Sequence, residues 1–123
     1  MSTDNVTFEH SHPAAADQST KKYYGVSINS SGEAALISAI THVPVGIQQN
    51  APANQGVPTA IASNGISKCV LGGTLTAGVL VGFSADGKIV ADAATNYTAG
   101  VLVKGGVDTE IGEVFLRNFT KKA

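Results

Sequence analysis

The sequence has little of what catalytic, nucleic-acid-binding and membrane proteins usually need. It has one cysteine, Cys69, and no tryptophan, so neither an intrachain disulfide nor a cysteine zinc cluster can hold the fold. Charged residues make up 14%, and 8 Lys and Arg nearly balance 9 Asp and Glu, so the basic excess that accompanies phosphate binding is missing. No apolar run approaches the ~20 residues that span a bilayer. We therefore expect no nucleic-acid partner, no membrane partner and synthesis in a reducing cytoplasm.

The residues that are abundant favour strands and tight turns. The chain has 13 Val and 8 Ile against 6 Leu, and β-branched side chains pack well on pleated sheets. Its 14 glycines recur at short intervals, as turns between short strands require. The 123 residues correspond to the length of one domain. The sequence predicts an all-β fold: a compact β-barrel or β-sandwich of short strands with an extended N-terminal arm.

Alternating apolar residues and turn signals place the expected strands. The expected strands are residues 24–29, 43–47, 59–63, 66–71, 79–83, 88–91, 100–103 and 113–116. Pro44 marks a strand start or an edge. Asn64-Gly65 predicts a hairpin that folds residues 66–71 back onto 59–63, and Asp86-Gly87 predicts a second tight turn. Residues 35–40 fit a strand or a short helix, and their length leaves this open.

Three pairs of glycines repeat with nearly constant spacing. Gly32 and Gly87 are 55 positions apart, and the pairs at 46 and 100 and at 56 and 112 are 54 and 56 apart. This spacing suggests that one strand–turn–strand unit occurs twice. Two units are too few for a solenoid, so a barrel or sandwich with internal pseudo-symmetry fits better.

Residues 1–22 differ from the rest of the chain. Residues 5–10 alternate apolar and polar, with Val6 and Phe8 on one face, but Pro13 soon follows and few large apolar groups are present. Such a segment cannot offset its own ordering entropy. We therefore divide the chain into an extended N-terminal arm (1–22), a β body (23–118) and a short tail (119–123), and expect the arm to lie across a neighbouring subunit.

Few residues are candidates for chemistry. His10 and His12 would share one face of a strand and supply half of a metal site, but we interpret them as solvated or interface histidines. Cys69 follows Lys68, yet no base lies nearby in sequence, so we interpret it as a small core residue. Asp108 and Glu110, with Glu113 beyond them, form an acidic cluster that fits ordinary surface beside Lys104. We expect no catalytic residue, no cofactor and no metal.

The second half of the chain carries an ordered series of motifs. Residues 72–103 contain an Ala-Gly turn with a valine-rich strand, an Asp-Gly-Lys hairpin, an alanine-rich link and a Gly-Val strand, and residues 111–116 contain a final Gly-Glu-Val strand. This order, over about residues 65–117, resembles the small capsid cement (head-decoration) proteins of tailed bacteriophages. Each motif alone is ordinary turn chemistry, so the resemblance rests on their order.

The resemblance implies a structural virion protein without enzymatic activity. Such a protein would bind the outside of the capsid, stabilise contacts between subunits of the major capsid protein, and form a homo-oligomer, most simply a trimer. The expected partner-binding residues on or beside the arm are Val6, Phe8, His10, His12, Tyr23 and Tyr24. The alternative is a small non-catalytic binding or carrier β module, for which Lys88, after Asp86-Gly87, is the one candidate carrier lysine.

Overall fold

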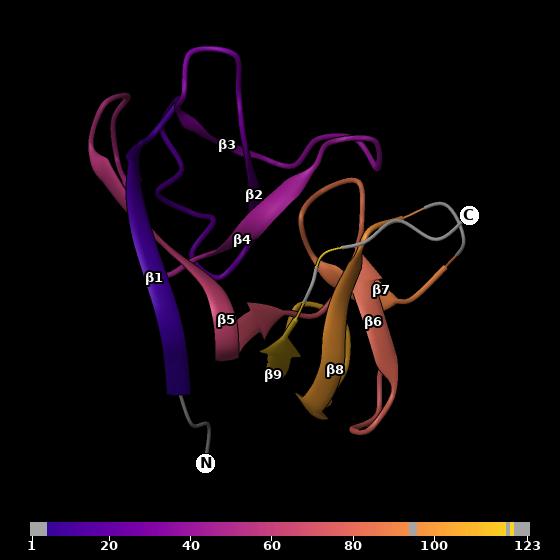
Figure 1. Ribbon diagram of the computed structural model, residues 1–123. Coiled ribbons are helices and arrows are strands. Elements are labelled where there is room, and N and C mark those ends of the chain that lie inside the picture. Colours follow the sequence, from indigo (N-terminus) through magenta and orange to yellow (C-terminus); the bar gives the residue numbers. More distant parts are fainter. Residues whose placement is uncertain (1–4, 94–95, 118, 120–123) are drawn as a thin grey trace.

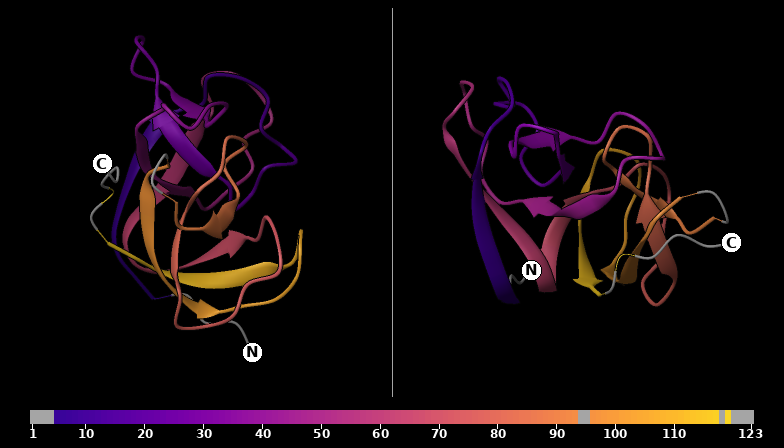
Figure 2. Two further views of the ribbon diagram at one scale, coloured as in Figure 1. Left: turned by 90° about the vertical axis from the view of Figure 1, so that its right-hand side faces the viewer. Right: turned by 45° about the horizontal axis from the view of Figure 1, so that its top comes forward.

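The computed structural model describes residues 5–93, 96–117 and 119, and of residues 5–8 it describes the backbone alone. These residues form nine strands and no helix. In chain order they are β1 (Asn5–Pro13), β2 (Gly25–Ile28), β3 (Ala34–Leu36), β4 (Pro44–Gln48), β5 (Pro58–Val70), β6 (Leu80–Phe83), β7 (Ile89–Ala91), β8 (Thr98–Lys104) and β9 (Ile111–Leu116). All strand pairs are antiparallel, and the sheet curls strongly (Figures 1 and 2), so the all-β prediction is confirmed.

The long strand β5 organises the sheet. Its first half pairs with β1 on one edge and with β4 on the other, and its second half pairs with β9. The predicted hairpin at Asn64-Gly65 is therefore wrong, because β5 continues through this dipeptide without turning back. Gly65 has φ 92°, and the β1 register shifts here, since Val6 pairs with Gly65 and Phe8 with Asn64. Gly65 stays within the strand instead of forming a turn, because it pairs with Val6 on one side and with Leu116 on the other.

The strand order occurs twice. The sheet runs β3-β2-β4-β5 and then, beyond β5, β9-β8-β6-β7. Each half therefore has a central strand, β2 or β6, between a short hairpin partner, β3 or β7, and a longer strand, β4 or β8. We call β1–β4 with the first half of β5 repeat 1 (residues 5–63), and the second half of β5 with β6–β9 repeat 2 (residues 64–116). Figure 1 shows them on either side of the bend in β5.

The first strand of each repeat is also equivalent. A parallel bridge after β1 joins Ala14 to Ala34, and a parallel bridge after β5 joins Leu71 to Ile89. The Ala14 amide donates to the Val57 carbonyl at 2.9 Å, just before β5. In the same way the Leu71 amide donates at 2.9 Å to a carbonyl just before β9, that of Glu110. Each repeat thus curls into a small five-stranded barrel, and β1 is the first strand of repeat 1.

Backbone conformations that normally require glycine also match between the repeats. Gly46 and Gly100 have φ 147° and 151°, and a Cβ on either would overlap a carbonyl of the next strand, that of Ala62 or of Phe115. Besides glycines, only Tyr23 (φ 69°) and Thr109 (φ 68°) have positive φ among the described residues. Their counterparts are glycines: Gly78 has φ 89° and Gly56 has φ 87°. A duplicated unit is therefore present in the structure, as the pairs Gly32/Gly87 and Gly46/Gly100 predicted, but the pairing of Gly56 with Gly112 is wrong, because Gly56 corresponds to Thr109.

Two apolar clusters fill the interior. The smaller lies inside repeat 1 and contains Val26, Ala34 and Ile61. The larger fills repeat 2 and extends to three buried residues of repeat 1, namely Ile37, Ile47, and Ala62. Repeat 2 thus packs its interior against one face of repeat 1.

The matched turns give a test of the repeat. Thr109→Gly should raise the free energy of unfolding by about 0.5–1 kcal/mol, because a left-handed conformation costs ~1–2 kcal/mol in a residue with a Cβ, whereas added glycine freedom in the unfolded chain costs only ~0.4–1 kcal/mol. Gly56→Thr should lower it by a similar amount, since a Cβ there meets nothing within 4 Å and only the φ of 87° opposes it. Urea denaturation measures both. If both substitutions changed the free energy of unfolding in the same direction, positions 56 and 109 would not be equivalent.

Candidate interaction surface

The structure corrects the interpretation of the N-terminal arm. The segment is extended, but β1 pairs with β5 of the same chain along its whole length, from Asn5 opposite Ile66 to Pro13 opposite Pro58 (Figure 2). The backbones of Val6 and Phe8 lie in this ladder, and their side chains, which we expected in a partner's groove, are outside the described residues. A partner strand is thus available within the chain, which is why the segment is ordered without a neighbour.

The residues after β1 are also part of the body. The Ala15 amide donates to the Ala34 carbonyl at 2.9 Å, and the Gln18 amide to the Pro52 carbonyl at 2.8 Å. Gln18 is buried, and its side-chain amide also donates to Ala34 at 3.0 Å. At the other end, Phe119 packs edge-to-face on Phe83 with ring centroids 5.6 Å apart. The boundaries expected at residues 23 and 119 therefore do not separate free segments from the body.

The structure brings His10 and His12 together. A ring nitrogen of each, Nδ1 of His10 and Nε2 of His12, lie 2.8 Å apart, and the ring planes meet at 77°. Both side chains are half-buried, and as alternate residues of β1 they lie on one side of the strand. Among the described residues no group of three or more His, Cys, Asp and Glu side chains gathers as a metal site would require.

Tyr23 and Tyr24, just before β2, make cation–π contacts with lysine side chains. The ammonium of Lys21 lies 4.8 Å from the centre of the Tyr24 ring, and those of Lys22 and Lys68 lie 5.1 and 5.8 Å from the Tyr23 ring. Tyr23 also packs against the larger apolar cluster. Its carbonyl accepts the Val70 amide at 3.2 Å, so this tyrosine joins the two repeats.

Cys69 and the acidic residues have structural surroundings. Cys69 is fully buried, and burial raises the pKa of its thiol to about 12, so the prediction of a core residue is confirmed. Glu110 accepts the Val107 amide at 2.9 Å in the turn before β9. Glu113 is 5% exposed, opposite Lys68 and Lys104 on the adjacent strands, and so is not the surface carboxylate we expected.

Lys88 does not resemble a carrier lysine. Its ammonium lies 3.9 Å from the Asp86 carboxylate and 4.0 Å from that of Asp108, and its side chain is only 20% exposed. A carrier lysine has to project from a hairpin tip so that its attached group can swing between sites. Lys88 instead ties its own hairpin to the turn before β9.

The surface that the sequence analysis missed is an apolar row on the outside of repeat 2. Leu80 on β6 pairs with Val101 on β8, which pairs with Phe115 on β9, so the three side chains project from the same face. Leu80 is 43% exposed, Phe115 is 46% exposed and Val101 is partly exposed. The neighbouring Val79 and Val103 are 38% and 42% exposed. Large side chains of this kind, gathered on one face, mark a candidate interaction surface.

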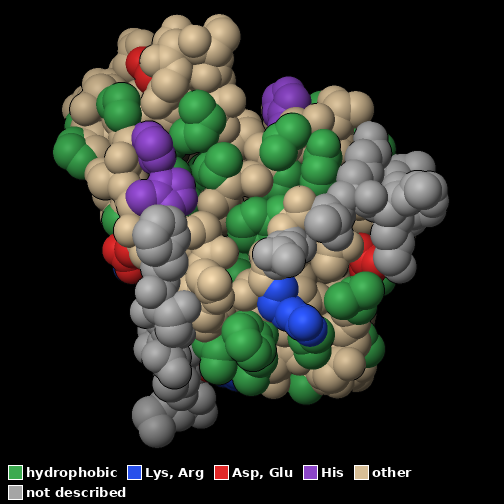
Figure 3. Space-filling view, in the orientation of Figure 1, with side chains coloured by type: hydrophobic (Ala, Val, Ile, Leu, Met, Phe, Trp, Pro, Cys, Tyr) green, Lys and Arg blue, Asp and Glu red, His purple; other side chains and the backbone are tan. Residues whose placement is uncertain are grey.

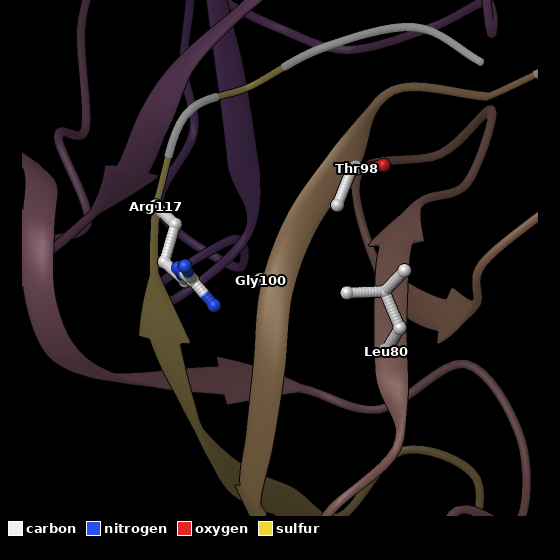
Figure 4. Close-up of a pocket in the computed structure, with 4 residues that line it drawn as sticks. All are labelled: Leu80, Thr98, Gly100 and Arg117. Carbon is white, nitrogen blue, oxygen red and sulfur yellow. The ribbon is translucent and has the colours of Figure 1, made fainter.

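Arg117 follows β9 and lies beside this row. Its side chain points toward Gly100 on β8 (Figure 4), and Figure 3 shows a basic side chain with hydrophobic side chains on both sides. A shallow groove of about 180 Å³ lies on the Leu80 side, where it is lined by Leu80, Thr98, Gly100 and Arg117. A second of about 240 Å³ lies on the Phe115 side. The face is thus an uneven apolar surface with one positive charge, suited to a protein partner.

A further groove lies at the far end of repeat 1. Its volume is about 330 Å³, and it is lined by Ser27, Ile28, Asn29, Ala35, Thr41, His42 and Val43. Val43 is 58% exposed and Ile28 is 36% exposed. The His42 ring accepts a hydrogen bond from the Ser38 amide at 3.3 Å, which fixes the loop on one side of the groove. This groove also has an apolar lining open to solvent.

Strand alternation contains the signal for the missed row. Positions 111, 113, 115 and 117 face one way along β9, and they include both charged residues and Phe115. In the sequence, charged residues at positions 113 and 117 indicate the solvent side, and Phe115 is in phase with them, although Glu113 itself is buried in the structure. The sequence analysis predicted a strand at residues 113–116 but did not assign its side chains to faces, and so overlooked the row.

Comparison with known proteins identifies the fold. No protein-family model matches this chain, and no curated protein matches it either. Among solved structures, the chain is similar to the crystal structure of the head fiber gp8.5 N base of bacteriophage phi29, with a TM-score of 0.70 and 12% sequence identity. The similarity covers 94% of this chain and 100% of the other. The two chains share a fold over nearly the whole of this chain.

The placement of the segment that follows β1 is testable by amide hydrogen exchange on the isolated protein. The amides of Ala14, Ala15 and Gln18 should exchange far more slowly than in an unstructured peptide, because each donates to a carbonyl elsewhere in the chain. Exposed backbone such as that of Ser30, between β2 and β3, is the control. Free-peptide exchange rates at residues 14–18 in a verified monomer would mean that the segment is an arm after all.

Proposed function

We propose that this chain is a structural virion protein of a tailed bacteriophage. In this proposal it binds the outside of the capsid and stabilises contacts between subunits of the major capsid protein, as a homo-oligomer that we expect to be a trimer. The observation that carries the proposal is the whole-domain similarity to a phage head fiber base, since 94% of this chain and 100% of that one superpose. The motif order in residues 72–103 points independently to capsid-binding proteins.

The surface chemistry supports a protein partner. With a formal net charge of −1, the chain has no charge field that would hold it on nucleic acid. It does expose apolar side chains in organised places: the row Leu80–Val101–Phe115 with Arg117, and the groove beside Ile28. Exposed apolar side chains around an arginine are typical of the energetically dominant part of a protein interface.

Attachment in many copies makes modest single contacts sufficient. A capsid presents the same junction repeatedly, and an oligomer that engages several junctions gains from a high effective concentration after the first contact. Each copy needs only a moderate interface, of about 800 Å² per partner. Small β domains of this kind can therefore reinforce a shell without enzymatic activity.

Cosedimentation tests the proposal. The purified protein should pellet with capsids of the phage that encodes it, prepared without this protein, and should saturate at a fixed number of copies per capsid. It should also raise the temperature at which the capsids open. The unassembled major capsid protein is the control, because a junction between subunits exists only in the shell. Protein that stays in the supernatant would contradict attachment, and binding with an unchanged opening temperature would contradict stabilisation.

A further inference from the structure

The exposed row on repeat 2 has a buried counterpart on repeat 1. In repeat 1, Gly25 on β2 pairs with Ile47 on β4, which pairs with Ala62 on β5. This is the same register as Leu80, Val101 and Phe115, at strand positions related by the repeat. Yet Gly25 is buried, and Ile47 and Ala62 are each 0% exposed. One surface of the repeated unit is thus covered in repeat 1 and open in repeat 2.

Repeat 2 itself covers the row on repeat 1. Ile47 and Ala62 belong to the same apolar cluster as the interior of repeat 2. A Cβ placed on Gly25 would lie 2.6 Å from Cδ1 of Phe83, so the Phe83 ring sits directly on this glycine. The Gly25 amide donates to the Gly87 carbonyl at 2.7 Å, in the turn between β6 and β7. The β6–β7 hairpin of repeat 2 therefore docks on the outer face of repeat 1.

The contact between the repeats is not reciprocal: repeat 2 docks on the outer face of repeat 1, but repeat 1 does not dock on the outer face of repeat 2. In the reverse contact, the β2–β3 hairpin of repeat 1 would dock on the outer face of repeat 2. Ile28, which corresponds to Phe83, would then pack on Leu80, which corresponds to Gly25. Instead Ile28 is 36% exposed beside a groove lined by repeat 1 alone, and Leu80 is 43% exposed beside a groove lined by repeat 2 and Arg117, with no residue of repeat 1. A contact that is not reciprocal joins two different surfaces, head to tail. Each molecule therefore keeps one unused surface of each kind.

The two unused surfaces present the same backbone positions as the contact within the chain. Within the chain a large ring, Phe83, packs on a residue without a side chain, Gly25. Between chains, two aliphatic side chains, Ile28 and Leu80, would meet at the corresponding positions. The counterpart of the Gly87 carbonyl belongs to Gly32, which is exposed in its turn with φ 78°. It could accept the Leu80 amide as Gly87 accepts that of Gly25.

We propose that a second copy of this chain docks on the row Leu80–Val101–Phe115 through its β2–β3 hairpin, with Ile28 against Leu80. The interface repeats between molecules the contact that joins the two repeats within one. Such a head-to-tail interface forms a ring when its rotation closes. It rests on the homo-oligomer of the proposed function and is independent of which surface meets the capsid.

Mixed cysteine variants test the direction of the contact. Ile28→Cys and Leu80→Cys, each purified separately and then mixed, should give a covalent dimer with a short bismaleimide cross-linker. Each variant alone should give almost none, because in a head-to-tail contact Ile28 meets Leu80 and not its own copy. The wild-type protein is the control, since its cysteine, Cys69, is fully buried. Cross-linking of a single variant by itself, or none in the mixture, would overturn the proposal.

Charge substitutions test whether the interface holds the oligomer. Leu80→Asp and Ile28→Asp should each raise the dissociation constant of the oligomer at least about tenfold in analytical ultracentrifugation, because each places a carboxylate in the apolar contact. Val107→Asp is the matched control, since Val107 is 50% exposed and lines neither groove, and it should change nothing. Circular dichroism checks that all three variants fold.

The outcomes separate this interface from the proposed function. Oligomers that survive Leu80→Asp and Ile28→Asp in folded protein would overturn the interface, as would a wild-type protein that stays monomeric at high concentration. Neither result concerns capsid attachment, which cosedimentation measures directly. Loss of capsid binding by these variants with an intact oligomer would assign the row to the capsid protein and so would also overturn the proposal.

Discussion

The continuity of β5 is the constraint on which the rest of the structure depends. A strand of 13 residues is long enough to serve two barrels in turn, with its first half closing repeat 1 and its second half opening repeat 2. Gly65 allows this, because its φ of 92° bends the strand without ending it. If the chain turned back at Asn64, β1 would lose its partner and repeat 2 would lose its first strand. The bend also brings the interior of repeat 2 onto the outer face of repeat 1.

Much of the fold follows from local sequence. Gly32 and Gly87 mark the two hairpins, Pro44 begins a strand as predicted, and glycine spacing indicates the repeat. The hairpin predicted at Asn64-Gly65 failed because the choice between turning back and continuing the strand is made by the strands on both sides, which are distant in sequence. The sequence analysis did not recognise β1 as the first strand of repeat 1 for a related reason. β1 and the second half of β5 share a backbone role but little residue chemistry, since β1 carries two histidines and the second half of β5 carries none.

The interaction surface was harder to predict than the fold. The composition change near residue 23 reflects a polar first strand, and polarity alone does not distinguish a covered edge from a free arm. Phe115 and Ala62 occupy equivalent positions in the repeat, yet Phe115 is 46% exposed and Ala62 is 0% exposed. The difference lies in whether another repeat packs on them. Burial of these two positions depends on how the two barrels pack, and no local sequence pattern encodes that packing. The equivalence of Phe115 and Ala62 follows from the strand registers, which the sequence alone does not give.

The central claim is that the apolar row of repeat 2 is buried between molecules as its counterpart is buried within one. An isotope-filtered nuclear Overhauser experiment on a mixture of ¹³C-methyl-labelled and unlabelled protein measures this directly, since it detects only contacts between different copies. The account predicts cross-peaks from the Leu80 and Val101 methyl groups to Ile28 of the other copy. Cross-peaks between the Leu80 row and the same row of another copy, or none at a concentration where the protein is oligomeric, would contradict it.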